Sequence, residues 1–156
     1  KDEEGTKQIR YAEYSINNLL VEIIVKKEDE WLILCPTKKT GSDMSKALLE
    51  LSPPIPHFYR NKPMPSLEQI GSSNIRIQSI HTSKGDQADN VAIVVKGIGD
   101  MSMLVNDPRL AYVALTRAKY HMVPRVVAEG LLPFMRSKSD YAGIASEYER
   151  MFPSKI

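Results

Sequence analysis

The chain of 156 residues has a single cysteine, Cys35, which excludes an intrachain disulfide and any metal site built from several cysteines. Cys35 ends the apolar run of residues 31–35, a setting typical of a buried structural thiol rather than a nucleophile. The three histidines, His57, His81 and His121, lie far apart and lack the spacing of metal ligands. The sequence therefore predicts no metal site.

Long hydrophobic runs and a strong charge of one sign are also missing. No apolar segment approaches the roughly 20 residues needed to cross a bilayer, and the first residues, KDEEGTKQ, do not form a signal peptide. We expect an intracellular, cytoplasmic protein without a membrane partner, associated with the nucleoid if the source is bacterial. The 21 basic and 19 acidic residues leave a net charge of +2, so binding to nucleic acid would need a local cluster of basic and polar groups.

Short apolar segments alternate along the chain with segments of helical periodicity. The segments that predict strands are residues 31–35, 58–59, 75–79 and 91–95. The segments that predict helices are residues 8–25, a helix capped by Ser42 or Asp43 that runs to Leu51, a helix that starts at Asp107 and Pro108, and residues 140–151. This alternation predicts one α/β domain, an open and mostly parallel sheet with helices on both faces. Residues 61–73 are expected to be the least ordered part.

Two segments carry the chemistry. Residues 77–85, IQSIHTSKG, run from an alternating apolar segment into small polar and basic residues, and residues 110–119, LAYVALTRAK, place Arg117 at the end of an apolar helix. Arg117 continues a helical stripe that includes Leu110 and Val113, and a guanidinium on an apolar face needs an anionic partner. Two plainer interpretations stay open: an arginine that interacts with the helix dipole, or a structural salt bridge.

The two segments together resemble motifs V and VI of the superfamily 1 helicases, most closely the UvrD/Rep type. The fixed positions of motif VI are matched by Tyr112, Val113, Ala114, Thr116, Arg117, Ala118 and Lys119. Motif V is matched at His81, Lys84 and Gly85, and Ser79 stands where the family has threonine. Gln87 stands where the family usually has a glutamate that contacts the ribose. The ordered pair is far more specific than either motif alone.

The resemblance implies that residues 1–156 form the second RecA-like motor domain of an ATP-dependent DNA helicase or translocase. It assigns contacts with single-stranded DNA to Ser79, His81, Thr82 and Lys84, and nucleotide contacts to Gly85 and Gln87. Arg117 would be an arginine finger that crosses the interdomain cleft to the γ-phosphate. The implied direction of movement is 3′ to 5′. The turn after residue 79 has a plainer interpretation as well, as a strand-to-loop connection with solvated polar residues.

The sequence contains no GxxxxGK[ST] loop, so this chain cannot itself cradle nucleotide phosphates with Mg²⁺. We expect ATP and Mg²⁺ to bind the full-length protein, through an N-terminal RecA-like domain that precedes this chain, and neither to bind the chain alone. Only residues 61–73 stand where the UvrD/Rep type has a large inserted subdomain. The alternative is a degenerate helicase-like module that binds nucleic acid or protein without catalysis. Gln87 and the missing insertion favour this module, and the intact motif VI argues against it.

Overall fold

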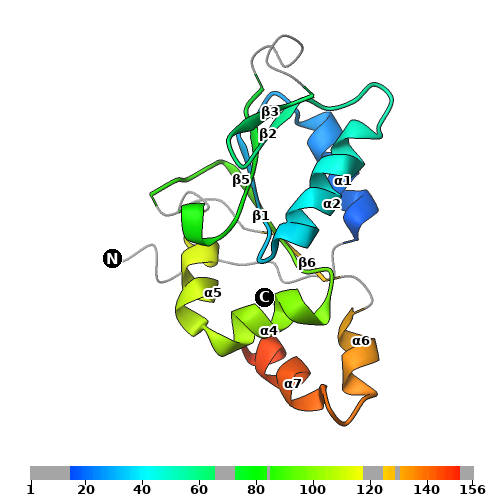
Figure 1. Cartoon of the computed structure of the whole chain (residues 1–156), viewed down its shortest axis with the longest axis vertical. Coiled ribbons are helices and arrows are strands. Elements are labelled where there is room, and N and C mark those ends of the chain that lie inside the picture. Colours follow the sequence, from blue (N-terminus) through cyan, green and yellow to red (C-terminus); the bar gives the residue numbers. More distant parts are fainter. Residues whose placement is uncertain (1–14, 66–72, 84, 118–124, 129–130, 152–156) are drawn as a thin grey trace.

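The computed structural model describes residues 15–65, 73–83, 85–117, 125–128 and 131–151. The strands are β1 (Trp31–Leu34), β2 (His57–Tyr59), β3 (Lys62–Met64), β4 (Ile75–Gln78), β5 (Asn90–Val94) and β6 (Arg125–Val127). They form one sheet in the order β3-β2-β4-β1-β5-β6 (Figure 1). Every neighbouring pair is parallel except the antiparallel hairpin of β2 and β3. The predicted open, mostly parallel sheet is confirmed.

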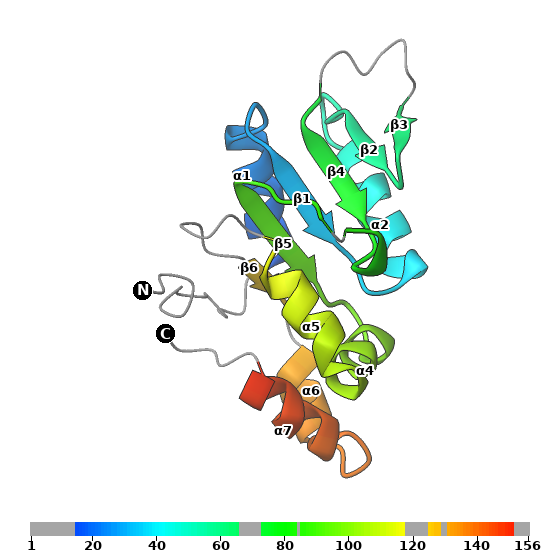
Figure 2. The same cartoon turned by 90° about the vertical axis from the view of Figure 1, so that its left-hand side faces the viewer.

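Helices cover both faces of this sheet, as predicted. They are α1 (Ile16–Val25), α2 (Lys38–Leu49), α4 (Ile98–Asn106), α5 (Pro108–Leu115), α6 (Leu131–Arg136) and α7 (Ala142–Met151), and His81–Ser83 form the 3-10 helix η2. Trp31 and Ile33 of β1 belong to the core beneath α1 and α2, whereas Leu32 and Leu34 belong to the core beneath α4, α5 and α7. Figure 2 shows α4 to α7 gathered together, apart from α1 and α2. None of the helices that the structure describes is long and apolar enough to cross a bilayer.

Two predicted helix starts are wrong, and a capping side chain explains each. Ser15 is extended and its side chain accepts the N–H of Asn18 at 2.9 Å, so α1 begins at Ile16 rather than at residue 8; residues 8–14 lie outside the described residues. Thr37 is likewise extended and its side chain accepts the N–H of Thr40. The helix α2 therefore begins at Lys38, four residues before the predicted cap, and its first turn follows β1 almost directly.

Several elements were not predicted. No helix was predicted between residues 95 and 107, but residues 98–106 form α4, in which Met101 and Leu104 are fully buried. The strand β3 contains Pro63, which the hairpin tolerates because β3 lies at the edge of the sheet. The short elements β6 and α6 were also missed. Of these elements, α4 and α6 complete the layer of helices on the second face.

Candidate nucleic-acid and nucleotide site

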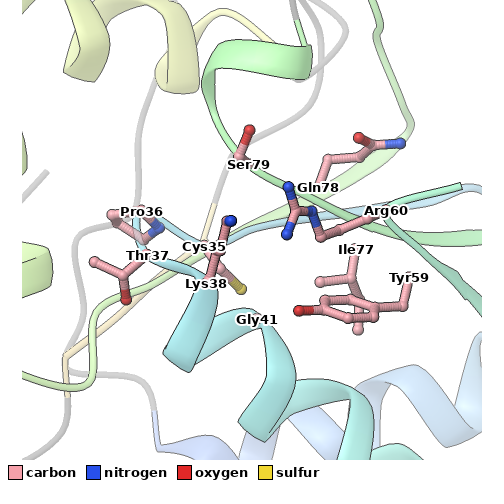
Figure 3. A pocket seen from close by; sticks show the side chains of 10 residues that line it. All are labelled: Cys35, Pro36, Thr37, Lys38, Gly41, Tyr59, Arg60, Ile77, Gln78 and Ser79. Carbon is pink, nitrogen blue, oxygen red and sulfur yellow. The ribbon is translucent and has the colours of Figure 1, made fainter.

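The candidate site lies where the chain leaves the sheet at the carboxyl ends of β1 and β4. These two strands are neighbours, but the connection after β1 leads to β2 on one side and the connection after β4 leads to β5 on the other. Ligands of open parallel sheets bind at carboxyl ends where successive connections diverge in this way. A cavity of about 210 Å³ opens at this point, between the ends of β1, β2 and β4 and the first turn of α2 (Figure 3).

The cavity has an apolar floor and a polar rim. Its floor is formed by Cys35, Gly41, Tyr59 and Ile77. Its polar rim is formed by Thr37, Lys38, Arg60, Gln78 and Ser79, and the buried Pro36 completes the lining. In Figure 3 the Arg60 side chain, from the turn after β2, lies above the Tyr59 ring, and the Lys38 side chain, from α2, lies beside Cys35 at the other side of the cavity. The cavity can therefore accept a group that is apolar at one end and anionic at the other.

Three of the residues predicted to contact DNA lie in one turn after β4. The Ser79 Oγ lies 3.0 Å from the Thr82 Oγ1 and accepts the Thr82 N–H at 3.2 Å. His81 is exposed on η2 between them, and Ser79 also lines the cavity. Lys84 lies outside the described residues. The structure thus brings two hydroxyl groups and an imidazole to the surface beside the cavity.

The turn after β4 is tied to the β2–β3 hairpin by a buried glutamine that sequence reasoning missed. The Gln78 Oε1 accepts the Thr82 hydroxyl at 2.9 Å, and its Nε2 donates to the Asn61 Oδ1 at 3.0 Å. Arg60 and Asn61 form the two-residue hairpin turn, with φ of 51° and 70°. The Arg60 N–H donates to the Ile77 carbonyl at 2.9 Å. The Arg-Asn pair between short strand segments was the only sequence signal for this arrangement.

A buried carboxylate supports the start of α2, and it was also missed. Asp100, 2% exposed in the first turn of α4, accepts the Thr37 hydroxyl at 2.6 Å and the Thr40 hydroxyl at 2.5 Å. It also accepts the backbone N–H of Lys96 at 2.9 Å. Three donors therefore satisfy one buried charge, as burial of a carboxylate requires. This contact fixes the helix start that forms one wall of the cavity.

Two buried titratable groups near the site are uncharged. Burial, and secondarily the charge of Asp100, raises the pKa of the Cys35 thiol far above its usual range, so the thiol is neutral and unreactive as predicted. Burial lowers the pKa of His57, whose ring nitrogens lie 2.7 Å from the Ser45 Oγ and 2.9 Å from the Ile55 carbonyl oxygen. These contacts suit a neutral imidazole, so His57 has a structural role.

Arg117 joins motif VI to motif V. Its Nη1 donates to the carbonyl oxygens of Ser83 and Asp86, each at 3.2 Å, and its own carbonyl accepts the Ala88 N–H at 3.1 Å. Its Nε donates to the Val113 carbonyl at 3.0 Å, at the end of α5. The two motifs, separated by 24 residues of sequence (86–109), are therefore one structural unit.

The surroundings of Arg117 differ from the prediction. The helix α5 ends at Leu115, so Arg117 lies in the turn beyond it and not on its apolar stripe. Its hydrogen bonds within the described residues go to carbonyl oxygens and the Thr116 hydroxyl, not to an anion. The bond to Val113 is the kind that a basic residue makes at a helix carboxyl end. The helix-end interpretation left open by the sequence thus describes part of the geometry.

The two residues predicted to contact the nucleotide lie beside this junction. Gly85 has a φ of 86° with nothing within 4 Å of a Cβ built on it, and Gln87 is exposed. Asp86 between them pairs with Arg76 at 3.2 Å. The Arg117 guanidinium, the open turn at Gly85 and the exposed Gln87 amide are groups that can bind one side of a nucleotide. Among the described residues, no group of three acidic, histidine or cysteine side chains could hold a metal ion.

The structure resembles the C-terminal domain of the DEAD-box protein Dbp5. The TM-score is 0.51 at 13% sequence identity, and the match covers 96% of this chain and 87% of that chain. No protein-family model matches the chain, and neither does any curated protein. The likeness shows a RecA-like fold of the kind found in a helicase C-terminal domain. It does not single out the UvrD/Rep type, since the similar structure is that of a DEAD-box protein.

Proposed function

We propose that this chain is the C-terminal motor domain of an ATP-dependent helicase or translocase that moves on single-stranded DNA. It would work with an N-terminal RecA-like domain that supplies the phosphate-cradling loop and the Mg²⁺ ligands. The observation that carries the proposal is the junction of motifs V and VI. There the Arg117 guanidinium is bound to the carbonyl oxygens of Ser83 and Asp86, at the carboxyl edge of a RecA-like sheet.

Ser79, His81, Thr82 and Lys84 would form part of the DNA track. Hydroxyl, imidazole and ammonium groups bind phosphate oxygens without reading the sequence of the bases, so binding should be tolerant of sequence and sensitive to salt. The Ser79–Thr82 hydrogen bond and the Gln78 amide hold the two hydroxyls in place before any strand binds. The proposal includes translocation in the 3′ to 5′ direction, which the UvrD/Rep resemblance implies.

Arg117 would supply charge to the nucleotide site from this side of the cleft. Bound ATP would supply the phosphoryl bond that is hydrolysed. In the structure four of the five guanidinium N–H groups donate to protein oxygens, so a two-point contact with phosphate oxygens would require Arg117 to give up at least one of these bonds. Because the Ser83 and Asp86 carbonyls border the Ser79–Thr82 turn, this exchange would release the turn that grips DNA. The geometry thereby supports coupling between hydrolysis and grip.

The alternative function is a binding module without catalysis. The same hydrogen bonds favour it, because an arginine that only holds motif V against motif VI needs no nucleotide. In that case Arg117 would contribute to stability and not to turnover. The two functions therefore differ in what removal of this side chain does.

ATP hydrolysis by the chain and by the full-length protein tests the proposal. The 156-residue chain should hydrolyse no ATP above background with or without single-stranded DNA, because it lacks a phosphate-cradling loop. The protein that carries both motor domains should show hydrolysis that single-stranded DNA stimulates. Turnover by the chain alone would contradict the proposal that the N-terminal domain supplies the phosphate-binding part of the active site. A full-length protein that binds DNA but hydrolyses no ATP would favour the binding module.

A further inference from the structure

We propose that the cavity at the ends of β1, β2 and β4 holds one unstacked base of the bound single strand, with Lys38 and Arg60 pairing the adjoining phosphate. This inference rests on the proposed function, because it assumes that a strand lies along the Ser79–Thr82 turn. It adds a base-binding site to a surface that would otherwise contact only the nucleic-acid backbone.

The floor of the cavity suits a flat ring and not a bare anion. The Tyr59 ring lies beside Ile77 (Figure 3), and the thiol of Cys35 next to them is uncharged because burial raises its pKa. A phosphate placed among these groups would lose its hydration without gaining a charged partner. The cavity volume of about 210 Å³ exceeds the roughly 150 Å³ that accommodates a benzene ring in a protein interior. A nucleobase therefore fits both the volume and the chemistry.

Gly41 keeps this floor open. It lies within α2, where glycine is less favourable than alanine by about 1 kcal/mol. A Cβ at this position would lie 3.3 Å from the Tyr59 Cε1, 3.7 Å from the Cys35 Cβ and 3.9 Å from the Ile77 Cγ2. A larger side chain would thus enter the space between the groups that line the cavity. Gly143 in α7, by contrast, has nothing within 4 Å of its built Cβ.

Two cations face the opening from opposite sides. Lys38 extends from the first turn of α2 and Arg60 from the β2–β3 turn, and both are exposed. The Arg60 backbone is held by its hydrogen bond to the Ile77 carbonyl at 2.9 Å. The net charge of the chain is only +2, so attraction of a phosphate to this opening would depend on Lys38 and Arg60 themselves. A nucleotide unit, with an apolar ring and an anionic phosphate, matches this pairing of floor and rim.

The cavity is continuous with the proposed DNA track. Ser79 lines the cavity and also forms the hydrogen bond to Thr82 in the turn after β4. A strand that follows these hydroxyls would therefore pass the opening. The Gln78 amide is occupied by Asn61 and Thr82, so base recognition would depend on stacking and apolar contact, which tolerate any sequence.

Binding of two matched oligonucleotides to the 156-residue chain tests the inference. One is a short thymidine oligonucleotide, and the other is an abasic oligonucleotide with the same number of phosphates. The wild-type chain should prefer the thymidine strand by about tenfold, the effect expected of one stacked base. Gly41→Leu should remove this preference without changing the affinity for the abasic strand. Gly143→Leu, a matched glycine substitution in another helix, should keep the preference.

The outcomes separate this inference from the proposed function. Equal binding of the two strands by the wild-type chain, or a preference that survives in Gly41→Leu, would overturn the base site and leave the backbone track intact. Binding of neither strand would remove both proposals. If Gly41→Leu does not fold, Tyr59→Leu removes the ring and keeps apolar bulk; the preference should then fall several-fold, and an undiminished preference would overturn the inference.

Discussion

At the scale of single residues, Asp100 carries the largest predicted effect on stability. Asp100→Ala would leave the Thr37 and Thr40 hydroxyls and the Lys96 N–H without their acceptor. Buried donors left unpaired cost about 1 to 3 kcal/mol each in unfavourable cases, so we expect the free energy of unfolding to fall by about 3 kcal/mol. Urea unfolding measures this change.

Asp43→Ala is the matched control for Asp100→Ala. Asp43 pairs with Lys39 at 3.5 Å and with Lys96 at 3.3 Å on the surface, and exposed pairs contribute less than about 1 kcal/mol. Asp100→Asn, which keeps the shape and one oxygen, should fall between the two. Equal losses for Asp100→Ala and Asp43→Ala would contradict the role given to the buried carboxylate.

His57 predicts a dependence of stability on pH. Burial lowers the pKa of His57 below its usual 6.5, so the unfolded chain takes up a proton first as the pH falls. The stability contributed by neutral His57 is therefore fully present above about pH 6.5 and is lost as the pH falls toward the folded pKa. The urea midpoint of His57→Gln should depend less on pH in this range than that of the wild-type chain. His81→Gln, at an exposed position, should keep the wild-type profile; a wild-type profile in His57→Gln would refute the assignment.

At the scale of elements, the start of α2 links stability to the candidate site. Thr37→Ala removes the cap of α2 and the bond to Asp100, and should cost at least about 1 kcal/mol. It should also weaken binding of single-stranded DNA, because the first turn of α2 carries Lys38. Ser15→Ala removes the cap of α1 and should lower the melting temperature without changing DNA affinity. Equal effects of both variants on DNA binding would argue against a role for the α2 start.

The elements also show how far the sequence can be interpreted by itself. The apolar runs predicted β1 and β5, and Pro108 predicted the start of α5. These predictions are confirmed because each depends only on neighbouring residues in the sequence. The start of α2 depends on Thr37 and on Asp100, more than sixty residues away, which no local pattern reveals. Arg117 was identified by its motif, but its partners are backbone carbonyls that every sequence supplies. The residues of a site can thus be predicted where their contacts cannot.

At the scale of the whole molecule, motifs V and VI, the cavity and the start of α2 lie along one edge of the sheet. Residues 79–87 form one segment: the described DNA-binding candidates lie at its start and the nucleotide-binding candidates lie at its end. The Arg117 guanidinium binds the middle of this segment, because it donates to the carbonyl oxygens of Ser83 and Asp86. Under the proposed function, a change at the nucleotide side would therefore be transmitted over a few residues to the DNA side.

Hydrolysis by Arg117 variants of the protein with both motor domains tests this account most directly. Arg117→Ala should lower the DNA-stimulated rate by about 10³-fold or more, well beyond any loss of folded protein, while nucleotide affinity changes little. Arg117→Lys should rescue little, because a point charge cannot replace the planar fork. Arg109→Ala, at a side chain that is 95% exposed, should keep the wild-type rate. An Arg117→Ala protein that melts early, yet turns over normally while folded, would contradict the account and leave Arg117 as a structural link between the two motifs.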